Sequence, residues 1–175
     1  MKIIILPPEI SQKIAAGEVI ERPFSVVKEL VENSLDAGSS EVKVELGAGG
    51  KKLVRVTDNG QGMTREDALL CFERHSTSKL SSLKDLSQVS TLGFRGEALP
   101  SISAGSRVTL KTSDGSGDLG TLVEREGEKL IRASDVAFPR GTSVEVKDLF
   151  FNLPAREKFL RSDKSELSSV VKHLA

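Results

Sequence analysis

The chain has 175 residues, enough for a single domain with a buried core. Hydrophobic residues make up 38% and charged residues 29% of it, a balance that is typical of a soluble globular protein and excludes a disordered or membrane-embedded one. The 25 basic side chains balance the 25 acidic ones, so no overall positive charge argues for nucleic-acid binding, and a single cysteine excludes an internal disulfide.

Two short elements are predicted before residue 20. The apolar residues 3–6 favour an edge strand, and residues 8–16 favour a short helix that ends at Gly17. Pro7 and Pro8 separate the two elements. The apolar run is too short for a signal peptide or a membrane span, so no membrane contact is expected.

The next element is a helix that begins near Pro23 and ends at Gly38. Proline suits the first turn of a helix, where no backbone N–H is needed, and glycine suits the left-handed conformation that ends one. Apolar side chains recur between them at helical spacing and predict a stripe that faces the core. The stripe consists of Val26, Val27, Leu30, Val31 and Leu35.

Polar side chains of this helix fall on an arc at the edge of the apolar stripe, where the wall of a cleft would lie. They are Glu29, Asn33 and Asp36. A carboxylate can take a proton from water, and a carboxamide oxygen can bind a hard cation such as Mg²⁺. The alternative is a solvated acidic face, which is the commoner use of charged residues on a helix.

A β-hairpin is predicted over residues 42–46 and 53–57, and its second strand runs directly into Asp58, Gly60 and Gly62. These glycines allow positive φ and let a flat ring approach the backbone. Asp58 could then accept a hydrogen bond from an exocyclic amino group such as that of adenine. A plain Asp-Asn-Gly turn is the alternative. Thr64 is expected to cap a helix that runs to about residue 74.

Residues 75–92 predict a mobile loop, followed by a glycine-rich segment, residues 93–96, that opens a helix over about residues 97–103. Free N–H groups at a helix start form a natural phosphate cradle, although an ordinary glycine-rich helix start fits the same residues. The glycines of residues 115–120 match a dinucleotide-binding pattern, but a strand-like sequence follows them. They therefore predict a hairpin turn.

Strands are predicted over residues 108–112, 119–126, 130–133 and 142–147, and helices over residues 154–160 and 165–174. Thr142 offers a hydroxyl at the start of the last strand. Helices that precede a run of hairpin strands predict an α+β fold, a two-layer sandwich with helices on one face of the sheet. Basic residues between 156 and 164 alternate with acidic ones, which favours a solvated helix face over a phosphate-contacting patch.

Taken in order, these motifs resemble the four motifs of the GHKL ATPases, a superfamily that includes type II DNA topoisomerases and histidine kinases. The finer resemblance is to the MutL family of DNA mismatch repair proteins. The segments that carry it are residues 14–23, 32–38, 77–79, 93–99 and 152–160.

The resemblance implies a GHKL (Bergerat) ATP-binding fold over residues 1–175: a mixed, mainly antiparallel sheet with helices on one face and ATP between these helices and a lid. It implies that Glu29 is the general base, Asn33 the Mg²⁺ ligand and Asp58 the adenine reader. The other ATP-binding residues that it implies are Gly62, Thr77, Ser78 and Lys79 of the loop and lid, Gly93, Phe94, Arg95, Gly96, Glu97, Ala98 and Leu99 of the phosphate cradle, and Thr142.

The resemblance also implies slow, Mg²⁺-dependent ATP hydrolysis that acts as a conformational and dimerisation switch in mismatch repair. Its implied partners are a MutS-like mismatch recognition protein, DNA, and a second chain bound through the N-terminal region. It places the protein in the bacterial cytoplasm or the eukaryotic nucleus. In this family a transducer domain follows, and because it is absent here we expect weak turnover. A nucleotide-binding module without hydrolysis, or a DNA-binding module with a vestigial pocket, stays open.

Overall fold

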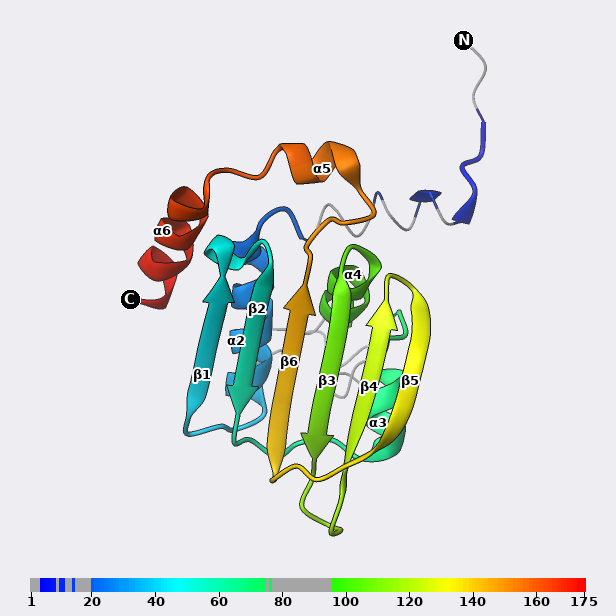
Figure 1. Ribbon diagram of the computed structural model, residues 1–175. Coiled ribbons are helices and arrows are strands. Elements are labelled where there is room, and N and C mark those ends of the chain that lie inside the picture. Colours follow the sequence, from blue (N-terminus) through cyan, green and yellow to red (C-terminus); the bar gives the residue numbers. More distant parts are fainter. Residues whose placement is uncertain (1–3, 9, 12–13, 15–19, 75, 77–95) are drawn as a thin grey trace, which may run out of the picture.

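The computed structural model of the chain describes residues 4–8, 10–11, 14, 20–74, 76 and 96–175 (Figure 1). Its elements in chain order are α2 (Pro23–Asp36), β1 (Val42–Gly47), the 3₁₀ turn η1 (Ala48–Gly50), β2 (Leu53–Asp58), α3 (Arg65–Leu70), α4 (Ala98–Ala104), β3 (Arg107–Ser113), β4 (Gly120–Glu126), β5 (Lys129–Val136), β6 (Gly141–Lys147), α5 (Pro154–Lys158) and α6 (Asp163–Leu174). Within the described residues, six strands form one sheet in the order β1-β2-β6-β3-β4-β5.

The sheet is built from hairpins that the last strand joins together. Strands β1 and β2 form one hairpin and β3, β4 and β5 form a meander, while β6 inserts between β2 and β3. Helices α2, α3 and α4 lie together on one side of the sheet (Figure 1). The predicted α+β sandwich with helices on one face is therefore confirmed. Every strand pairing among the described residues is antiparallel, so the parallel pairing that a mixed sheet implies is not seen among them.

The core lies between this helix layer and the covered face of the sheet. Because side chains alternate along a strand, directly paired residues point to the same face. One such row runs across the middle of the sheet through Val56, Val144, Leu110 and Val123, all buried. Val26, Val27 and Leu30 of α2 belong to the same buried cluster, as the helical spacing predicted.

The opposite face of the sheet carries charged side chains. Arg55 lies between Glu45 and Glu145 on the neighbouring strands and forms an ion pair with each. Burial alone would raise the pKa of Glu145, but hydrogen bonds from Arg55 and Lys147 outweigh burial and lower it. The hydrogen bond to Glu145 in turn raises the pKa of Arg55. This face of the sheet therefore carries paired charges where the other face carries the apolar core.

The prediction that Leu35 belongs to the apolar stripe is wrong. Leu35 is 52% exposed, whereas the neighbouring Ser34 is only 3% exposed. Ser34 follows Val27 and Leu30 at positions i+7 and i+4, so it continues their buried face, while Leu35 lies a further 100° around the helix. The predicted helix ends are confirmed: Pro23 lies in the first turn, and Gly38 has a φ of +70°.

Two other local predictions differ from the structure. Residues 4–6 are not in a strand. The helix predicted over 8–16 is not one of the two, because its described residues, 8, 10, 11 and 14, are helical and the others lie outside the described residues. Thr64 does cap α3 by accepting a hydrogen bond from the N–H of Asp67 at 3.1 Å, but the helix ends at Leu70. Apart from residue 76, the loop predicted over 75–92 lies outside the described residues. In the part of the chain that is described, no helix has the length and apolar character to cross a membrane.

Candidate functional site

The register of the sheet brings together two candidate residues that are far apart in the sequence. Asp58 ends β2 and pairs with Thr142 at the start of β6, which pairs with Thr112 of β3. This row lies two residues beyond the buried row of Val56 and Val144, so its side chains face the helix layer as well. The structure therefore places the predicted Asp58 and Thr142 side by side beneath the helices, and adds Thr112 next to them.

The carboxylate of Asp58 is held by two donors. The hydroxyl of Ser34 donates to Oδ2 at 2.7 Å, and the N–H of Gly60 donates to Oδ1 at 2.9 Å. Ser34 also lies 3.1 Å from the carbonyl oxygen of Leu30, which competes for the same hydrogen. Sequence reasoning did not find Ser34. The sequence does carry a signal for Ser34: it is a hydroxyl-bearing residue at a position that continues the buried face of α2.

Replacing Ser34 by alanine is expected to lower the free energy of unfolding by about 1–3 kcal/mol, since a hydrogen bond from a buried hydroxyl to a half-buried carboxylate is lost. Urea unfolding would measure this. Ser169→Ala is the matched control, because Ser169 makes the same bond to the carbonyl four residues earlier, at 3.2 Å, on an exposed helix face. Equal losses in the two variants would show that the contact with Asp58 contributes nothing.

The loop after Asp58 packs tightly against its neighbours, and its glycines serve this packing. A side chain on Gly60 would lie 2.9 Å from Ala37, and one on Gly62 would overlap the carbonyl of Ser113. Gly62 has a φ of +69°, as predicted. Gly60 does not have a positive φ, so that part of the prediction is wrong. Both glycines bring the loop against protein backbone, which fixes the position of Asp58.

Asn59 is a second residue that sequence reasoning missed. Its side-chain oxygen accepts hydrogen bonds from the N–H groups of Ser40 and Glu41 at 2.9 and 3.0 Å. The N–H of Gln61 donates to the carbonyl of Ala37 at 3.0 Å. These bonds join the segment that follows α2 to the loop that follows β2. They hold the C-terminal end of α2 next to Asp58.

Glu29 and Asn33, the candidate base and cation ligand, lie one turn apart on α2 and are both half-buried. Asp36, in the last turn, is half-buried too. Among the described residues, no group of three His, Cys, Asp or Glu side chains could hold a metal ion. A cation at Asn33 would therefore need oxygen ligands from a bound molecule or from water.

Only part of the predicted phosphate cradle is described. Gly93, Phe94 and Arg95, and the predicted lid residues Thr77, Ser78 and Lys79, lie outside the described residues. Gly96 has a φ of +63°, and a side chain there would lie 2.6 Å from the carbonyl of Ser76. Glu97 occupies the N-cap position of α4 without a capping bond from its side chain, and its carboxylate lies 3.5 Å from Arg74 in an ion pair. Ala98 and Leu99 form the first turn of α4, and Pro100 follows them.

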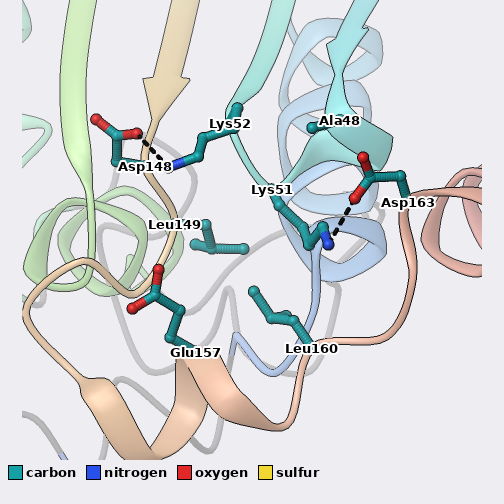
Figure 2. A pocket seen from close by; sticks show the side chains of 8 residues that line it. All are labelled: Ala48, Lys51, Lys52, Asp148, Leu149, Glu157, Leu160 and Asp163. Atoms are coloured by element: carbon teal, nitrogen blue, oxygen red, sulfur yellow. Dashed lines mark hydrogen bonds and ion pairs between the residues drawn. The ribbon is translucent and has the colours of Figure 1, made fainter.

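A hollow of about 270 Å³ lies at the other end of β2 from Asp58 (Figure 2). Its lysines are already paired: Lys51 Nζ lies 2.5 Å from Asp163 and Lys52 Nζ 3.3 Å from Asp148. None of the predicted site residues lines it, so it is separate from the candidate site. The residues that line it are Ala48, Lys51, Lys52, Asp148, Leu149, Glu157, Leu160 and Asp163.

Comparison with known proteins gives a family match and close relatives. Residues 20–136 match the family described as histidine kinase-, DNA gyrase B-, and HSP90-like ATPase. The DNA mismatch repair protein MutL of Solibacter usitatus is 56% identical over 169 residues, which are 97% of this chain and 26% of that protein. The chain thus spans about a quarter of the length of the curated relatives that it matches.

Solved structures show the same likeness. The MutL ATPase domain of Aquifex aeolicus complexed with ADP aligns with a TM-score of 0.68 and 38% identity, over 89% of this chain and 54% of that one. The N-terminal domain of a DNA repair protein aligns with a TM-score of 0.75 and 27% identity, over 93% of this chain and 46% of that one.

Proposed function

Because the chain belongs to the family of histidine kinase-, DNA gyrase B- and HSP90-like ATPases, we propose that it binds Mg²⁺-ATP and hydrolyses it slowly, as a nucleotide switch in DNA mismatch repair. The relatives that cover 97% of the chain are mismatch repair proteins, and one structural neighbour is a complex with ADP. The whole range of residues 1–175 would serve as the ATP-binding domain.

The position of Asp58 is the observation that best supports adenine recognition. Both of its described partners, the Ser34 hydroxyl and the Gly60 N–H, are donors. A carboxylate has about four lone-pair sites, so it can accept a further hydrogen bond from an exocyclic amino group. Thr142 pairs directly with Asp58 on the same face and adds a hydroxyl beside it. Backbone contacts at Gly60 and Gly62 keep this arrangement rigid.

Glu29 and Asn33 would divide the chemistry on α2 between them. Glu29 would take the proton from the water that attacks the terminal phosphate. Asn33, one turn further, would offer its amide oxygen to Mg²⁺. The bound ion would supply positive charge to the phosphate oxygens during the reaction. The rest of the ion's ligands would be phosphate oxygens and water, as is usual for Mg²⁺ at nucleotide sites.

The phosphates would be bound by residues 93–99, including Gly96, Glu97, Ala98 and Leu99, while Thr77, Ser78 and Lys79 would close over them. ATP binding would favour the closed and dimeric state, and hydrolysis would release it. The partners would be a MutS-like protein, DNA, and a second chain. Closure would also involve contacts from the part of the protein that follows this range in the longer relatives.

Calorimetric titration of the chain with ADP, ATP and UDP, each with and without Mg²⁺, tests the nucleotide site. We expect ADP and ATP to bind with dissociation constants below about 1 mM, and ATP to bind more weakly without Mg²⁺. UDP carries the same two phosphates as ADP without a purine, so it should not bind measurably. No heat from either adenine nucleotide, together with salt-sensitive DNA binding, would instead support a DNA-binding module with a vestigial pocket.

A further inference from the structure

Thr112 lies at the junction of three segments that build the candidate site. Its side chain is 0% exposed. Its hydroxyl oxygen lies 3.0 Å from the N–H of Met63, 3.0 Å from the carbonyl oxygen of Gly141 and 2.9 Å from the hydroxyl oxygen of Thr142. These partners belong to the loop after Asp58 and to the start of β6. Thr112 therefore contacts Thr142 and the loop that follows Asp58, and its own hydroxyl is buried among these partners.

The direction of each of these hydrogen bonds follows from the chemistry of the partners. The N–H of Met63 can only donate, and the carbonyl of Gly141 can only accept. Because a hydroxyl carries one hydrogen, the hydrogen of Thr112 goes to Gly141. Thr142 must then donate its own hydrogen to Thr112. The oxygen of Thr142 is left as an acceptor for anything that binds beside it.

We propose that Thr112 is a specificity-determining residue: by taking the hydrogen of Thr142, it makes the site beside Asp58 a pair of acceptors that selects a purine with an exocyclic amino group. The inference rests on the proposed nucleotide site. Adenine has an amino group at this edge, whereas hypoxanthine has a carbonyl oxygen in the same place. A pair of acceptors attracts the amino group of adenine and repels the carbonyl oxygen of hypoxanthine. Thr112 acts through Thr142 and is thus a positioning residue.

Removing the hydroxyl of Thr112 has a consequence that a loss of packing would not have. In Thr112→Val the shape is nearly kept, but the hydrogen of Thr142 is released and can turn to donate to the hypoxanthine oxygen. Met63 and Gly141 also lose a partner, which weakens the binding of both nucleotides. The ratio of the dissociation constants of inosine diphosphate and ADP cancels this common loss and reports only the choice between the two bases.

The experiment measures this ratio by calorimetry for the wild type, Thr112→Val and Thr112→Ser. Thr109→Val is the control, because Thr109 lies on the same strand and points to the open face of the sheet. We expect the ratio to fall by about tenfold in Thr112→Val, the equivalent of one hydrogen bond. It should stay at the wild-type value in Thr112→Ser, which keeps a hydroxyl, and in Thr109→Val.

Equal weakening of ADP and inosine diphosphate in Thr112→Val, with an unchanged ratio, would overturn the inference while leaving nucleotide binding intact. Failure of the wild type to bind ADP would overturn the proposed function and this inference with it. If Thr112→Val does not fold, Thr142→Val replaces it, because it deletes the acceptor directly. The ratio should fall in Thr142→Val too, and an unchanged ratio there would overturn the inference.

Discussion

Replacing Asp58 by asparagine is expected to weaken ADP binding by about 10²-fold or more. Asparagine has the same shape but offers one acceptor oxygen where aspartate offers two. The described partners of Asp58, Ser34 and Gly60, donate to different oxygens. In the variant, one of these donors or the adenine amino group must therefore face an NH₂ group. A site built to hydrogen-bond a ligand group loses much of its affinity when one partner is mismatched.

Asp114→Asn is the matched control for this substitution. Asp114 accepts a hydrogen bond from the N–H two residues later, that of Ser116, at 2.9 Å, which is the same turn geometry as that of Asp58 and Gly60. It lies in the turn between β3 and β4, two residues beyond Thr112, and its hydrogen bonds with Ser116 are exposed. Calorimetry should show ADP affinity unchanged in Asp114→Asn and strongly reduced in Asp58→Asn. Wild-type affinity in Asp58→Asn would remove this carboxylate as the adenine reader.

Local patterns were sufficient to predict α2 and the hairpins. The apolar spacing, with Pro23 and Gly38 at the ends, determines a helix from neighbouring residues alone, and the structure has it over Pro23–Asp36. The glycines of residues 115–120 were predicted to form a hairpin turn, and they join two antiparallel strands, β3 and β4. Both predictions depend on interactions between residues that are close in the sequence, where spacing carries the information.

Contacts between distant segments could not be predicted in the same way. That Asp58 lies beside Thr142 follows from the insertion of β6 between β2 and β3, and no residue pattern states the order of strands. Ser34 and Thr112 look like ordinary polar residues in apolar surroundings. Each is important because of a distant hydrogen-bond partner: Asp58 lies 24 residues from Ser34 in the sequence, and Thr142 lies 30 residues from Thr112. Polar side chains in line with a buried face are the signal that would have drawn attention to them.

The glycines of the loop after Asp58 have a different use in the structure from the one that was predicted. Gly60 and Gly62 were expected to leave room for a flat ring. In the structure, Ala37 and Ser113 of the protein occupy the space that their side chains would need. The glycines therefore contribute by holding the loop against α2 and β3. The carboxylate of Asp58 gains a fixed direction from this packing, which is the property that recognition of a base requires.

Replacing Glu29 by alanine in the full-length protein is expected to lower ATP turnover by about 10²-fold or more while ATP binding is retained. General-base catalysis contributes a factor of that size. Glu29 is half-buried on α2, one turn before Asn33. Removal of the base slows proton transfer from the attacking water, whereas the adenine reader on β2 is untouched. Steady-state turnover and calorimetric ATP affinity, measured on the same samples, separate these two effects.

Glu32→Ala is the control, because Glu32 is an acidic residue of the same helix that lies 4.0 Å from the exposed Lys28, in a long ion pair. Such pairs contribute little to stability, so both turnover and binding should stay near the wild-type values. Turnover that is unchanged in Glu29→Ala would remove Glu29 as the base. A wild-type protein that binds ATP but never hydrolyses it would identify the site as a regulatory nucleotide-binding module, in which occupancy alone controls the contacts with partners.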